Sequence, residues 1–182
     1  IPTAERMGLI HSIDLLVVDK TIDFLAEFPN MSNISVSINL SSAAFQNKTL
    51  LPVIKEKLDL TWVDPRRITF EITETAAVNN FKQTSIMIEK IRALGCKFAL
   101  DDFGAGFCSF NYLKAFPVDY VKIDGQFIQN LVNNETDQVL VKSMVEIAKK
   151  LGKKTIAEFI ETPETIEKLR ELGINFGQGY VF

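Results

Sequence analysis

The stretch Phe98-Ala99-Leu100-Asp101-Asp102-Phe103-Gly104-Ala105-Gly106 decides how this chain is interpreted. A short apolar run ends in two adjacent carboxylates, and a glycine-rich turn follows. Neighbouring side chains on a strand point to opposite faces, so two consecutive acids cannot both face one core. Where a strand ends and turns into a loop, both can reach the same cavity. The stretch therefore predicts a buried strand with a polar site at its end, and a solvated strand end is the alternative for this motif taken alone.

The composition is that of one globular domain, with 182 residues of which 47% are hydrophobic and 24% charged. The net charge of -3 argues against binding to a nucleic acid polymer. No apolar run approaches the roughly 20 residues of a membrane span, and no signal peptide is visible, so any membrane anchor is expected outside the given residues. Cys96 and Cys108 lack metal-site spacing and favour a reducing compartment, which predicts a cytoplasmic domain.

Segments with strand and helix patterns alternate along the chain. After an expected loop at 1–11, β-branched and alternating apolar residues predict strands at 34–40, 67–74, 97–101, 119–124, 154–159 and 174–182. Helical periodicity predicts helices at 12–28, 50–58, 81–94, 109–116, 125–132, 136–151 and 163–172. Pro29-Asn30, Gly95 and Gly173 are typical helix ends. Such alternation predicts parallel strands joined by right-handed helical crossovers.

Six strands fit either an open doubly wound sheet or a barrel. The polar residues favour the barrel, because each of the six predicted strands carries one within it or at its end: Asn39, Glu71, Asp101, Lys122, Glu158 and Gln178. The carboxyl-end mouth of a (β/α)₈ barrel collects residues from many strands, whereas an open sheet uses a few at one switch point. A complete barrel needs about 200 residues or more. We therefore predict an α/β fold, a TIM-like barrel here lacking its first two strands.

The predicted strand ends are rich in hard oxygen donors: Asn39, Glu71, Asp101, Asp102 and Glu158. Oxygen-only ligand sets suit Mg²⁺ or Mn²⁺, and carboxylates that converged without cations would raise one another's pKa. Asp101 and Asp102 are candidates to bridge two ions about 3.5–4 Å apart, as in two-metal phosphoryl transfer. Lys122 would neutralise a phosphate oxygen or orient the attacking water. The only histidine, His11, lies in the expected loop, which argues against Ser-His-Asp and Cys-His mechanisms.

A series of motifs resembles the EAL-domain family, bacterial phosphodiesterases that linearise cyclic di-GMP. In order these motifs are Asn39-Leu40-Ser41, Glu71-Ile72-Thr73-Glu74, Asp101 to Gly106, Lys122-Ile123-Asp124, Ala157-Glu158-Phe159-Ile160-Glu161 and Gln178-Gly179-Tyr180. The resemblance covers essentially the whole chain. It implies a barrel that binds two Mg²⁺ or Mn²⁺ ions and a water that attacks one phosphodiester, giving linear pGpG.

The resemblance also implies roles for single residues. Asn39, Glu71 and Asp101 match ligands of the first ion, and Asp101, Asp102 and Glu158 match those of the second. Glu158 is also implied as general base, and Lys122 as the lysine beside the attacking water.

Further implied roles concern the substrate and the partners. Gln178, Glu161 and Ser41 match substrate-contacting or supporting positions. Glu74 matches an acid that steadies the loop at 102–106 and links metal binding to dimerisation. The family implies a homodimer, with sensor or diguanylate cyclase-like domains in the full-length protein.

Two departures from the family pattern stand out. The Glu-Ala-Leu strand is absent, so residues 1–182 are expected to be an EAL domain that is incomplete at its N-terminus and slightly short at its C-terminus. Phe159 stands where glycine is common, and Ala105 where threonine is common. The alternatives are a catalytically silent cyclic di-GMP receptor and an unrelated metal-dependent barrel enzyme, such as a lyase.

Overall fold

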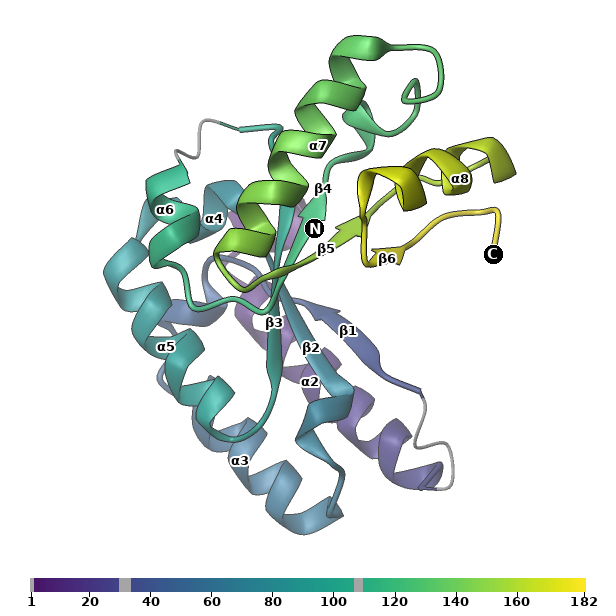
Figure 1. Ribbon diagram of the computed structural model, residues 1–182. Coiled ribbons are helices and arrows are strands. Elements are labelled where there is room, and N and C mark those ends of the chain that lie inside the picture. Colours follow the sequence, from purple (N-terminus) through teal and green to yellow (C-terminus); the bar gives the residue numbers. More distant parts are fainter. Residues whose placement is uncertain (1, 30–33, 107–109) are drawn as a thin grey trace. The chain divides into compact units, whose positions relative to one another are not determined.

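The structure, a computed structural model, describes residues 2–29, 34–106 and 110–182 (Figure 1). Asn30, Cys108 and Ser109, on which expectations were placed, lie outside these residues. Contacts divide the chain into two compact units: Ile1–Ile72 with Ala76–Phe98, and Thr73–Thr75 with Ala99–Phe182. Parallel strands alternate with helices in both, as the pattern predicted. No helix in the described ranges is both long and apolar enough to cross a membrane.

The first unit is built around two parallel strands. In chain order its elements are α1 (Pro2–Arg6), α2 (Ile10–Glu27), β1 (Val36–Asn39), η1 (Ala44–Gln46), α3 (Leu50–Thr61), η2 (Pro65–Arg67), β2 (Ile68–Thr73) and α5 (Phe81–Ala93). The register sets Val36 opposite Ile68 and Asn39 opposite Glu71. Because the two strands are parallel, both of their carboxyl ends point the same way, which places Asn39 beside Glu71.

The core of the first unit is aromatic and aliphatic. Phe98 packs against Phe70 and Phe45, with ring centroids 5.5 and 6.3 Å apart. After α5 the chain turns at Gly95, whose φ is 104°, and a Cβ there would lie 2.7 Å from Cγ of Pro65. Glycine is therefore required at this turn both for its backbone conformation and for space.

The second unit holds the other four strands, except that Lys97 and Phe98 at the start of β3 belong to the first unit. Its elements are β3 (Lys97–Phe103), α6 (Phe110–Ala115), β4 (Tyr120–Ile123), η3 (Gly125–Phe127), α7 (Glu135–Lys150), β5 (Lys154–Ala157), α8 (Pro163–Leu172) and β6 (Phe176–Gly177). Strands β3 to β6 pair in sequence order, all parallel. Helix α7 packs on β4 and β5 through a buried stripe that includes Val141, Val145 and Ala148.

Several predicted boundaries are wrong. Residues 1–11 are not all loop, because Pro2 opens α1, a position that suits proline's fixed φ. The helix expected at 125–132 is only the 3₁₀ helix η3 followed by turns, and the strand expected at 174–182 is reduced to β6. The strand expected to reach Glu74 ends at Thr73, where α4 (Glu74–Asn79) begins.

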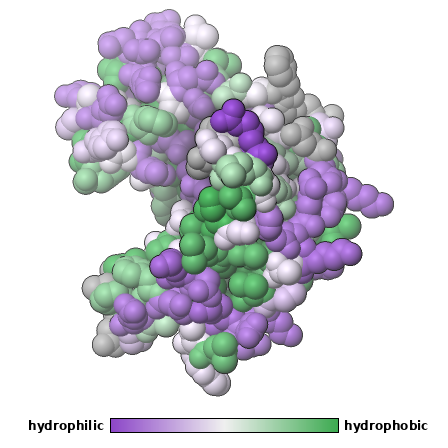
Figure 2. Space-filling model, turned by 180° about the vertical axis from the view of Figure 1, so that it is seen from behind, coloured by the Kyte–Doolittle hydropathy of each residue, from purple (hydrophilic) through white to green (hydrophobic). Residues whose placement is uncertain are grey.

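The surface is not uniformly polar. Helix α2 buries Val18, Ile22 and Leu25 yet also exposes apolar side chains such as Leu16 and Phe24. Figure 2 views the protein from the side opposite to that of Figure 1 and shows apolar residues gathered among polar ones.

Candidate functional site

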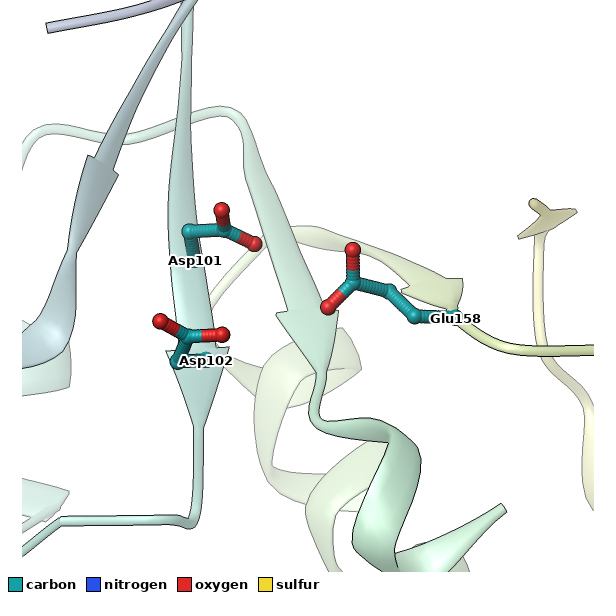
Figure 3. Close-up of side chains that lie close together, drawn as sticks. All are labelled: Asp101, Asp102 and Glu158. Carbon is teal, nitrogen blue, oxygen red and sulfur yellow. The ribbon is translucent and has the colours of Figure 1, made fainter. Parts of the chain in front are cut away.

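Three carboxylates meet at the ends of β3 and β5 in the second unit (Figure 3). Asp101 and Asp102 belong to β3, and Glu158 directly follows the last residue of β5. One oxygen of each carboxylate lies within 4.8 Å of an oxygen of each of the others. Figure 3 shows Glu158 facing the two aspartates from the end of β5, which is separated from β3 by β4. Residues up to 57 positions apart in the sequence thus form one acidic cluster.

The backbone of β3 explains how two consecutive acids reach the same place. Asp102 has a φ of 54°, in the left-handed region, and the register of β3 on β4 shifts between Leu100 and Phe103. An irregularity of this kind breaks the alternation of side chains between the two faces of a strand. Asp102 is thereby turned toward the side on which Asp101 lies.

Lys122 of β4 supplies the positive charge of the cluster. Its Nζ lies 2.9 Å from Oδ1 of Asp101 and 2.8 Å from Oε1 of Glu158, and its side chain is only 4% exposed. Three carboxylates and one ammonium leave a formal charge of -2 in the cluster. Asp102 is exposed, but Asp101 is half-buried and Glu158 is buried, and their burial makes such an excess of negative charge costly unless a further cation compensates it.

The pKa values of Glu158 and Asp102 reflect this excess of negative charge. Burial raises the pKa of Glu158, although the hydrogen bond and the charge of Lys122 act in the opposite direction. Burial also raises the pKa of Asp102, and the neighbouring charges of Asp101 and Asp124 raise it further. The cluster therefore favours uptake of positive charge, either as protons or as a metal ion.

The donor set fits a hard divalent cation. Oδ1 of Asp101 is buried and has no hydrogen-bond partner among the described residues, although Lys122 lies close to it. Several carboxylate oxygens close together are the ligands that Mg²⁺ or Mn²⁺ prefers, and among the described residues no soft sulfur or imidazole ligand is part of the cluster.

Glu74 holds the loop that follows β3. This buried residue opens α4, and its Oε2 accepts a hydrogen bond of 3.0 Å from the backbone N–H of Gly104. A Cβ on Gly106 would lie 2.5 Å from Oε1 of Glu74, so the loop passes directly over the carboxylate. The contact expected between Glu74 and this loop is present, and its link to dimerisation stays a prediction.

Gln178 lies beside Glu158 because the chain segments that carry them are hydrogen-bonded. Its backbone N–H donates to the carbonyl of Ala157 (2.9 Å), and its carbonyl accepts from the N–H of Ile160 (3.1 Å). Gln178 and Glu158 line one pocket, to which Glu161, an exposed residue, does not contribute. The other lining residues are Phe159, Gly179 and Tyr180.

The remaining candidates belong to the first unit. Asn39 is exposed at the end of β1, and Glu71 is buried beside it. Ser41 is held by Asp14 of α2, whose Oδ1 accepts from the Ser41 N–H (3.3 Å) and whose Oδ2 accepts from its hydroxyl (2.5 Å). That Asn39, Glu71 and Ser41 act together with the acidic cluster stays a prediction.

Asp14 was not predicted from the sequence as a partner of Ser41, although its position in the sequence indicates that it is buried. It falls in the buried stripe of α2 together with Ile10, Val18 and Ile22, at helical spacing. A carboxylate inside an apolar stripe needs a partner, and here Ser41 provides it.

Comparison with known proteins identifies the family. The model of the EAL domain family matches residues 1–182. The chain belongs to the EAL domain family. It is 40% identical to the cyclic di-GMP phosphodiesterase PdeB of Shewanella oneidensis, over 99% of this chain and 21% of that protein. It is 35% identical to the cyclic di-GMP phosphodiesterase PdeF of Escherichia coli, over 100% of this chain and 24% of that protein. The chain thus spans about a quarter or less of the length of these two relatives.

Solved EAL structures agree with the fold. The complex of PaMucR phosphodiesterase with c-di-GMP is similar with a TM-score of 0.90 and 30% identity, over 98% of this chain and 73% of that chain. The FimX EAL domain from Pseudomonas aeruginosa bound to c-di-GMP is similar with a TM-score of 0.90 and 31% identity, over 98% of this chain and 72% of that one. EAL domains have the TIM-like barrel fold, so both the predicted family and the predicted α/β barrel class are confirmed.

Proposed function

We propose that this EAL domain is the catalytic part of a phosphodiesterase that uses Mg²⁺ or Mn²⁺ to hydrolyse cyclic di-GMP to linear pGpG. The observation that carries the proposal is the cluster of Asp101, Asp102 and Glu158 around the buried Lys122. The names of the similar proteins, cyclic di-GMP phosphodiesterases of two bacteria, support the choice of substrate.

In this proposal the acidic cluster holds the divalent cations. Asp101, Asp102 and Glu158 supply carboxylate ligands, and Asn39 and Glu71 complete a two-ion set. Bound divalent cations would polarise the phosphodiester and make a nucleophile available from water at neutral pH.

Two residues of the chain act on the proton of the attacking water and on the charge of the phosphoryl group. Glu158 accepts a proton from the attacking water, a role that suits a carboxylate whose pKa is raised by burial. The water oxygen bonds to phosphorus, and the bond from phosphorus to one ribose oxygen breaks. That oxygen takes up a proton from solvent and leaves as a hydroxyl, and Glu158 later returns its proton to solvent. Lys122 stabilises the negative charge that develops on the phosphoryl oxygens.

The remaining assignments concern substrate and assembly. Gln178, Glu161 and Ser41 contact or support the dinucleotide, and Glu74 positions the loop after β3, through which metal binding would reach a homodimer interface. Because the similar proteins are about four times longer or more, we propose sensor or cyclase-like domains in the full-length protein. A cytoplasmic location is part of the proposal, because Cys96 and Cys108 favour a reducing compartment.

The test is hydrolysis of cyclic di-GMP by the full-length protein with Mn²⁺ or Mg²⁺, followed by detection of pGpG. Asp101→Asn and Glu158→Gln should each abolish turnover. Glu164→Gln, which changes an exposed acid in the first turn of α8, is the matched control and should leave turnover unchanged. Full activity of either cluster variant would refute the assigned roles. Tight binding of cyclic di-GMP by the unaltered protein without any product would favour the receptor alternative.

A further inference from the structure

Phe159 adopts a backbone conformation that a large side chain rarely takes. Its φ is 53°, whereas bulky residues strongly prefer negative values. The hydrogen bonds on either side force this geometry, because the Ala157 carbonyl and the Ile160 N–H both bond to Gln178 (2.9 and 3.1 Å). Glu158 and Phe159 therefore bulge out between two fixed points. Backbone strain beside a functional cluster suggests that the side chain of the strained residue has a function.

The ring of Phe159 rests on the backbone of Gly125, the first residue of η3. A Cβ placed on Gly125 would lie 2.3 Å from Cδ2 of Phe159 and 3.0 Å from its Cβ, so no larger residue fits beneath the ring. Phe159 nevertheless stays 50% exposed. The side chain is thus seated on a rigid turn and still offers apolar surface to solvent.

This exposed surface belongs to a pocket of about 390 Å³ that includes Glu158. The pocket is also lined by Gln178 and by Tyr180, which is 90% exposed. Aromatic rings combined with a carboxamide suit a flat heterocycle that stacks through its face and forms hydrogen bonds through its edge. A nucleobase has this chemistry.

We propose that Phe159 is a stacking platform for one purine base of the dinucleotide substrate. The inference rests on the proposed function and deepens it, because it assigns a specificity-determining contact to the pocket beside the acidic cluster. The base stacks on the ring of Phe159 while the attached phosphodiester reaches Glu158 and Lys122. Gly125 lies against the ring of Phe159 and holds it beside the pocket.

The test compares Phe159→Leu and Phe159→Tyr in the full-length protein. Leucine keeps an apolar side chain at the same strained φ but removes the aromatic face, whereas tyrosine keeps that face. We expect Phe159→Leu to raise KM for cyclic di-GMP between about fivefold and 100-fold, with a smaller effect on kcat, and Phe159→Tyr to behave like the unaltered protein. Phe24→Leu is the matched control, because Phe24 is also 50% exposed but belongs to α2 of the first unit.

Inhibition by two fragments separates base recognition from phosphate recognition. GMP carries the base and inorganic phosphate does not, so Phe159→Leu should weaken inhibition by GMP and leave inhibition by phosphate unchanged. An unchanged KM together with unchanged GMP inhibition in Phe159→Leu would overturn the proposal, as would equal weakening by both fragments. If the unaltered protein binds cyclic di-GMP but does not hydrolyse it, affinities replace KM, and weaker binding by Phe159→Leu would support stacking even though the catalytic proposal had failed.

Discussion

Replacing Lys122 by methionine tests whether this buried ammonium holds the acidic cluster together. The change keeps an unbranched side chain of similar length but removes the charge that lies 2.9 Å from Asp101 and 2.8 Å from Glu158. The side chains of these three residues are 4%, 14% and 10% exposed, so solvent compensates little for the loss. Removing one partner of a buried ion pair costs about 3–5 kcal/mol, because the other charge is left without compensation.

The assay is urea unfolding in the presence of EDTA at pH 7. We expect the free energy of unfolding of Lys122→Met to fall by about 3–5 kcal/mol, a large part of the roughly 5–15 kcal/mol available to a typical domain. Saturating Mn²⁺ should recover part of the loss, because a cation that binds only the folded state stabilises it.

Lys57→Met is the matched control. Lys57 also contacts two carboxylates, those of Asp19 and Asp23, at 2.8 Å each, but all three side chains are substantially exposed. Exposed pairs contribute about 0–1 kcal/mol, so this variant should lose little. A loss for Lys122→Met no larger than that for Lys57→Met would refute the charge-balance reasoning.

The pH dependence of the stability of Lys122→Met tests the same contact between Lys122 and Glu158. Because the pKa of Glu158 is raised in the folded state, its contribution to stability is present below its unfolded pKa and is lost as the pH rises through the folded pKa. Lys122 lowers this pKa, so Lys122→Met should raise it further. The stability deficit of the variant should therefore be largest at neutral pH and shrink as the pH falls and Glu158 takes up a proton. A deficit that grew on acidification would contradict the assignment.

Three further predictions follow from single contacts. Gly125→Ala should destabilise the protein by about 1–3 kcal/mol in thermal or urea unfolding, and much less when combined with Phe159→Gly, because the added methyl group meets the Phe159 ring. Ser41→Ala should lower the free energy of unfolding by about 1–3 kcal/mol at pH 7, measured by urea unfolding, because the Asp14 carboxylate loses the hydroxyl that donates to it. The loss should be smaller near pH 4, because burial raises the pKa of Asp14 and a protonated carboxyl depends less on that donor. Cys96 is buried and its pKa is raised to about 12, so in a variant whose other cysteine is serine it should react with a thiol reagent only as fast as the protein unfolds.

The sequence predicted those elements whose ends are set by nearby residues. Helix α8 was expected at 163–172 and is found there, because Pro163 suits a first helical position and Gly173, with a φ of 84°, ends the helix. Thr162 completes the start by accepting a hydrogen bond from the N–H of Thr165. All these signals lie within a few residues of the helix itself.

The expectations that failed depend on residues far away along the chain. The segment at 125–132 has helical periodicity, but its first residue, Gly125, lies against the distant Phe159 with no room for a larger side chain. Glu74 leaves the strand pattern and opens a helix, and its carboxylate binds the N–H of Gly104, 30 residues later. Local periodicity contains no information about such contacts, so it predicted a longer helix in one place and a longer strand in the other.

The same local signal, an acid within an apolar pattern, has different meanings at Asp14 and at Asp101. Both oxygens of Asp14 accept hydrogen bonds from Ser41, so the cost of burying this carboxylate is met within the fold. At Asp101, Oδ1 is buried, lies near Lys122 and has no hydrogen-bond partner among the described residues, and two further carboxylates crowd the same space. Asp14 thus has two hydrogen bonds from one residue, whereas Asp101 shares a single ammonium, that of Lys122, with Glu158. Because only the arrangement of three strands reveals this difference, the sequence could suggest both acids but could not rank them, and the role of Asp101 as a cation ligand stays a prediction.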